Sequence, residues 1–102
     1  MRQITQDAID AFYGKSNFKR SNTTVEYLLQ PHSETSTMYL FGNAIARLDH
    51  RTGRLTITNC GWESLTTKER LNGLHKVRIN QSKGQWYLNG EAWDGSVTEM
   101  VA

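Results

Sequence analysis

The sequence has few of the residues that cross-link small proteins or carry them through membranes. Only Cys60 among the 102 residues is a cysteine, which excludes an internal disulfide and is typical of a reducing compartment. No stretch approaches the roughly 18–20 consecutive apolar residues that a membrane-spanning helix needs. Residues 1–13 also lack the apolar centre of a signal peptide. We therefore expect a cytoplasmic protein with no membrane partner.

The sequence also lacks the usual residue patterns of catalytic and metal sites. His32, His50 and His75 fall in separate segments without the close spacing of zinc ligands. The acidic residues are scattered rather than paired, and no glycine-rich phosphate loop follows a predicted strand. Cys60 follows a strand and precedes Gly61, and we interpret it as a small buried residue beneath Trp62 rather than as a nucleophile. We therefore expect no metal, no cofactor, no catalytic residue and no enzymatic activity.

Length and composition fit one modest core. The apolar fraction is 37%, and the three Trp, four Tyr and three Phe residues are enough to fill a small interior. We expect a single domain over residues 1–95 and a frayed acidic tail over residues 96–102.

Periodicity predicts an α+β fold. An amphipathic helix is expected over residues 5–14, with Thr5 as its N-cap and Gly14 closing its last turn. Alternation of apolar and polar residues predicts strands over 23–30, 37–41, 44–48, 54–59 and 76–80. The segment 15–22 is interpreted as a loop. The result is an N-terminal helix and an antiparallel meander of about six or seven short strands, with a short helix inserted after the fourth.

Three local motifs define the turns and the second helix. Gly42–Asn43 is predicted as a two-residue hairpin loop, since both residues tolerate positive φ. Thr66 and Glu69 have capping-box spacing, which predicts a helix over about 67–72. Asn89–Gly90 predicts a type I′ turn that places Trp86 opposite Trp93, with one indole expected inside and the other partly outside.

Charge is concentrated in the middle of the chain. Residues 43–83 hold eight basic and three acidic side chains, whereas residues 84–102 hold no basic and three acidic ones. A basic sheet or hairpin with exposed aromatics is able to hold phosphate and stack bases. The candidate binding residues are Arg47, His50, Arg51, Arg54, Lys68, Arg70 and Arg78. Sheet edges and aromatics such as Tyr39, Tyr87 or Trp93 offer a different route, which is docking to a protein.

Four motifs carry a resemblance to a known group of proteins. They are Gly42-Asn-Ala-Ile-Ala46, Gly53-Arg-Leu-Thr-Ile57, Gly61-Trp62 followed by Thr66-Thr-Lys-Glu-Arg-Leu-Asn-Gly-Leu74, and Trp86-Tyr-Leu-Asn-Gly90. They resemble small uncharacterised proteins of bacteriophages and prophages. The resemblance implies a phage accessory protein in the cytoplasm of an infected or lysogenic bacterium. It favours a partner that is a host or defence-system protein, inhibited in the manner of an anti-CRISPR or anti-restriction protein. Direct nucleic-acid binding through residues 43–83 is the alternative.

Overall fold

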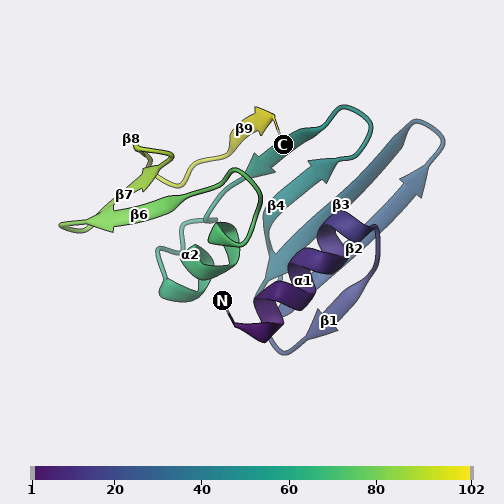
Figure 1. Ribbon diagram of the computed structural model, residues 1–102, viewed down its shortest axis with the longest axis horizontal. Helices are drawn as coiled ribbons and strands as arrows, with labels where there is room; N and C mark the ends of the chain where they lie inside the picture. The colour runs from purple at the N-terminus through teal and green to yellow at the C-terminus, as the bar shows by residue number, and fades with distance from the viewer. Residues whose placement is uncertain (1, 102) are drawn as a thin grey trace.

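The computed structural model describes residues 2–101 and confirms a small α+β fold (Figure 1). In chain order its elements are α1 (Gln3–Gly14), β1 (Phe18–Arg20), β2 (Thr23–Gln30), β3 (Ser33–Leu40), β4 (Asn43–Asp49), β5 (Arg54–Ile57), α2 (Leu65–Asn72), β6 (Ile79–Ser82), β7 (Gln85–Leu88), β8 (Glu91–Ala92) and β9 (Thr98–Val101).

Two antiparallel sheets organise these elements. The larger has six strands in the order β1-β2-β3-β4-β5-β9, and the smaller has three in the order β6-β7-β8. The hairpins from β2 to β5 form the expected meander, and α1 lies across one face of it (Figure 1). The smaller sheet projects away at the side farthest from β1. Within residues 2–101, neither helix lies over the opposite face of the large sheet (Figure 1).

Two strands were missed in the sequence. Residues 18–20, interpreted as loop, form β1 against β2, and Thr98–Val101, expected within a frayed tail, form β9 against β5. Both are short edge strands whose residues show little alternation of their own. Each forms only by pairing with a neighbouring strand. The partner of β9 is β5, about forty residues earlier in the chain, with Thr98 opposite Ile57. Local patterning does not carry that information.

The ends of both helices differ from the predicted caps. Thr5 is fully buried within α1, which begins at Gln3, and Lys15 rather than Gly14 takes the left-handed conformation at its end, with φ of 61°. In α2 the N-cap is Ser64, whose Oγ accepts a hydrogen bond from Thr67 N–H at 3.1 Å. Ser64 was overlooked because the Thr66 capping box offers the same chemistry two residues later.

The predicted hairpin from Trp86 to Trp93 is confirmed. Asn89 and Gly90 have φ of 50° and 89°, and Tyr87 lies opposite Ala92. The two indole centroids are 6.3 Å apart, and both rings are buried, so the expectation that one would be partly outside is wrong. The second ring is covered because Trp93 also donates from Nε1 to Thr98 Oγ1 at 2.9 Å, which fixes it beneath the β9 segment.

Candidate functional site

Arg70, predicted as a binding residue, is a buried structural residue. Its side chain is 0% exposed, and its guanidinium donates to Thr23 Oγ1 at 3.1 Å and to Thr5 Oγ1 at 2.6 Å. It also forms an ion pair with Glu69, whose carboxylate accepts a hydrogen bond from Thr5. These contacts join α2 to α1 and β2. They also satisfy the donors of the guanidinium, without which its burial would be strongly destabilising. Arg70 is therefore not available to a ligand, and Glu69 serves this network rather than a capping box.

Three further candidates are occupied by contacts within the fold. Arg51 donates to the carbonyl oxygens of Gln30 and Pro31, both at 3.1 Å, and so holds the two neighbouring hairpin ends together. Arg54 forms an ion pair with Glu99 on β9. His50 Nε2 lies 2.8 Å from Ser36 Oγ, and burial lowers the pKa of this imidazole.

The remaining candidates are exposed, or half-buried in the case of Lys68, and lie on different elements. Arg47 lies on the helix-free face of the large sheet, in a cross-strand row that runs Glu26, Thr37, Arg47, Thr56, Glu99. Acidic residues at both ends of this row offset the single arginine. Lys68 on α2 donates to Gln81 Oε1 at 3.0 Å, and Arg78 precedes β6. The seven predicted residues therefore do not form one basic surface.

The predicted aromatic anchors are also largely covered. Trp93 is buried, and Tyr39 and Tyr87 are half-buried in their strands. Cys60, interpreted as buried, is exposed. Its thiol points to the carbonyl oxygen of Ala44 at 3.0 Å, and partial burial of the sulfur raises its pKa, which disfavours the reactive thiolate.

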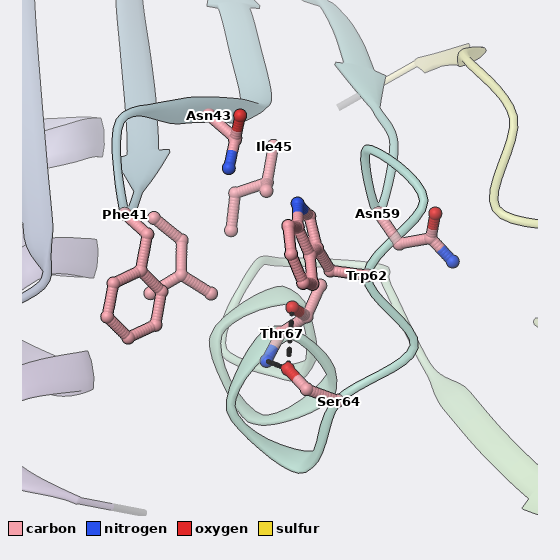
Figure 2. A pocket seen from close by; sticks show the side chains of 8 residues that line it. Phe41, Asn43, Ile45, Asn59, Trp62, Ser64 and Thr67 are labelled. Carbon is pink, nitrogen blue, oxygen red and sulfur yellow. Dashed lines mark hydrogen bonds between the residues drawn. The ribbon is translucent and has the colours of Figure 1, made fainter.

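An apolar groove lies between the β3–β4 turn and the start of α2 (Figure 2). Its volume is about 420 Å³. The lining residues are Leu40, Phe41, Asn43, Ile45, Asn59, Trp62, Ser64 and Thr67. Buried Leu40 and Ile45 provide an aliphatic floor, while the Phe41 and Trp62 rings stand on either side of it. We call this feature the Phe41–Trp62 groove.

Phe41 is held at the groove by a strained turn. The β3–β4 turn is centred on Phe41 and Gly42, with φ of 51° and 80°, and not on Gly42–Asn43 as predicted. The left-handed conformation costs an ordinary residue about 1–2 kcal/mol, which is why Asn or Gly usually occupies this position. Phe41 nevertheless occupies it with 72% of its surface exposed. This combination directs a large apolar side chain into solvent.

Trp62 is fixed by a second tight turn. Trp62 N–H donates to Asn59 O at 2.8 Å, and the intervening Cys60 and Gly61 have φ of 53° and 82°. Asn59 anchors this turn in the fold, because its backbone N–H donates to Gly95 O and its Oδ1 accepts from Gly61 N–H. Figure 2 shows its amide directed away from the groove. The turn leaves 62% of Trp62 exposed.

The polar atoms of the groove are few and uncharged. Ser64 Oγ and Thr67 Oγ1 lie 3.0 Å apart and satisfy each other. Asn43 is different, since its side-chain amide has no hydrogen-bond partner among residues 2–101, and its nitrogen points toward the space between the two rings (Figure 2). Asn59 Nδ2 is also unpaired within residues 2–101, but it is buried and directed away from the groove (Figure 2). The groove thus offers an apolar volume, two aromatic walls and one unpaired amide that faces it.

Within the described residues there is no group of three or more His, Cys, Asp or Glu side chains able to hold a metal ion. The same part of the chain contains no helix that is both long and apolar enough to cross a membrane.

The fold and the groove together define a small α+β protein with two exposed aromatic side chains beside an apolar groove. The Kyanoviridae Gp96 protein family matches residues 1–100, and the chain belongs to this family. It is therefore a bacteriophage protein, in agreement with the resemblance described above. No curated protein and no solved structure gives a significant match.

Sequence reasoning missed the groove but not all of its components. Gly42 and Gly61-Trp62 were singled out, yet each was assigned to a turn or to packing. The informative signal was Phe41 directly before Gly42, since a large aromatic next to a hairpin glycine competes with the Asn or Asp that the turn prefers. Trp62 also follows a Cys-Gly pair, which is typical of a turn. A tryptophan in a turn has less neighbouring surface to pack against than one in a strand.

Proposed function

We propose that this phage protein is a non-enzymatic accessory protein that binds a protein of the infected bacterium through the Phe41–Trp62 groove. Its partner is a host enzyme or a component of a defence complex, and binding inhibits it. The protein acts in the bacterial cytoplasm. The proposal assigns no chemical step and no cofactor to the chain.

The pair of exposed aromatic walls over an aliphatic floor is the observation that supports this function. Exposed apolar side chains that are scattered singly are ordinary, but here two of the largest flank one hollow. Buried aromatic anchors dominate the binding free energy of many protein interfaces. Phe41 also occupies a backbone position where it lowers stability, so its presence is better explained by contact with a partner than by folding.

The nucleic-acid alternative has less support. Arg70 is buried, Arg51 and Arg54 have partners within the fold, and Arg47 shares its row with Glu26 and Glu99. Binding to a polyanion depends on several basic groups that reach phosphates together. A titration with mixed-sequence DNA and RNA tests this alternative separately. Affinity that falls steeply between 50 and 200 mM salt, roughly a thousandfold, would favour it over the groove.

An affinity capture from lysate of the host bacterium tests the proposed function. Three baits are used, the full wild-type chain and its Trp62→Ala and Leu29→Ala variants. Bait and lysate are treated with nuclease. Leu29 is 63% exposed and lies at the end of β2 farthest from Thr23 and the groove, so its variant controls for general surface hydrophobicity. We expect a specific protein with wild type and Leu29→Ala, and a roughly 30-fold weaker affinity with Trp62→Ala, since an anchor contributes about 2 kcal/mol or more. Equal binding by all three baits would reject the groove as the binding surface.

A further inference from the structure

The chemistry of the Phe41–Trp62 groove indicates what kind of partner segment enters it. We infer that the groove binds an extended, uncharged peptide segment, which inserts a bulky apolar side chain between the two rings and pairs its backbone with the Asn43 amide. This inference rests on the proposed function, because it specifies the occupant of the same groove.

Charge is the first argument for this occupant. None of the eight lining residues carries a charge. A charged side chain that entered the groove would lose hydration without gaining an opposite charge, whereas an aliphatic or aromatic side chain would exchange water for Leu40, Ile45 and the two rings. The inserted group is therefore apolar.

The Asn43 amide is the second argument. A carboxamide offers one donor group and one acceptor, both neutral, which matches the N–H and C=O of a peptide bond. Ser64 and Thr67 already bond to each other. Asn59 Nδ2 also lacks a partner within residues 2–101, but its amide is directed away from the groove, so Asn43 is the unpaired polar group that faces it (Figure 2). Leaving this amide unpaired under a bound partner would cost affinity, and the occupant must therefore supply both a donor and an acceptor.

This requirement separates an extended segment from a helix. In a helix interior the backbone N–H and C=O groups bond to each other, so a helix would need a second, polar side chain beside its apolar anchor to pair with Asn43. An extended segment presents free backbone groups beside its inserted side chain. Strand addition to a sheet edge is a different mode, because the groove is bounded by the β3–β4 turn and α2, whereas the edges of the large sheet are β1 and β9.

Blocked amino acids test the inference with defined probes. N-acetyl-phenylalanine N-methylamide and its leucine counterpart carry one apolar side chain between two peptide bonds, and the lysine counterpart carries a charge instead. Toluene serves as an apolar ligand without amides. Binding to the full chain is followed by NMR through the Trp62 indole and Asn43 amide signals. Ligands of this size bind with Kd on the order of 0.1–1 mM when they fit.

We expect the phenylalanine and leucine probes to shift both signals and the lysine probe to bind at least tenfold more weakly. Asn43→Ala should weaken the affinity for the phenylalanine probe about fivefold, which corresponds to the loss of one neutral hydrogen bond. The affinity for toluene should not change. Asn80→Ala is the matched control, since Asn80 is an exposed asparagine on β6 outside the groove. Trp62→Ala should remove binding of the phenylalanine probe and of toluene.

Three results would overturn the inference. Equal binding of the lysine probe would contradict the uncharged occupant, and an Asn43→Ala variant that binds the phenylalanine probe normally would contradict backbone pairing. A concentration-dependent dimer of the wild type that Trp62→Ala abolishes would place a second copy of the chain in the groove. Failure here is distinguishable from failure of the proposed function, because a host partner whose capture depends on Trp62 would remain even if the blocked amino acids do not bind.

Discussion

Replacing Phe41 by Asn should stabilise the protein while weakening its binding. Phe41 has φ of 51° in a two-residue turn, a conformation that costs a residue of its type about 1–2 kcal/mol. Asn tolerates this conformation and precedes Gly in favoured type I′ turns, so most of that cost is recovered. With 72% of Phe41 exposed, the covered remainder contributes only about a quarter of the roughly 1.5–3 kcal/mol of full burial. The expected net stabilisation is about 0.5–1 kcal/mol.

Thermal unfolding followed by circular dichroism measures this change. A gain of this size raises the Tm by roughly 2–8 °C in a domain of this length. Phe41→Ala is the matched control, since it removes the ring but keeps the strained conformation, and it should lower the Tm slightly. A Tm for Phe41→Asn that falls by several degrees would refute the reasoning, because it would mean that Phe41 packs into the fold more than it strains it.

Three further predictions concern the framework around the groove. Gly95→Ala should destabilise the fold by about 2 kcal/mol or more, because residue 95 has φ of +85° and the new Cβ would lie 2.0 Å from Asn59 Nδ2. Gly84→Ala, at a similar φ but in open space, should cost about half as much, and equal losses of stability in urea unfolding would contradict the clash. Arg70→Met should cost about 3–5 kcal/mol in the same assay, since it leaves a buried network without its donor, and a loss below 1 kcal/mol would show that the network is dispensable. The pKa of His50 in the folded protein lies below its ordinary 6.5, so the unfolded chain binds the proton more tightly. The free energy of unfolding should therefore fall as pH decreases through 6.5 toward the folded pKa. His50→Gln should flatten the dependence of stability on pH between pH 7 and 5, and an unchanged slope would contradict the assignment.

Local signals in the sequence predicted the parts of the fold that depend on neighbouring residues. The bounds of β2 and the turn at Asn89–Gly90 follow from alternation and from residues that tolerate positive φ, and both are confirmed. The α+β class follows from the same signals. These elements need little information from distant parts of the chain.

The misassigned residues are those whose role depends on a distant partner. Arg70 is polar and lies on a short helix, so its sequence context is that of a surface residue, yet Thr5 and Thr23 enclose it from segments about 65 and 47 positions earlier. Phe41 and Trp62 are far apart in sequence and face each other only because the β3–β4 turn and the start of α2 meet. The Phe41–Gly42 pair is a local signal for one wall, but the groove as a whole has no local pattern. Its recognition required the arrangement of the two elements in space.

The central claim, that the Phe41–Trp62 groove binds the partner, has one direct measurement. Trp86 and Trp93 are buried, so of the three indole N–H signals in an NMR spectrum only that of Trp62 reports on the groove. Trp62→Phe identifies this signal by its disappearance. When the partner captured from host lysate is added, the account predicts that the Trp62 signal shifts or broadens first, while the signals of the two buried indoles change less. Binding that leaves the Trp62 signal in place would contradict the account.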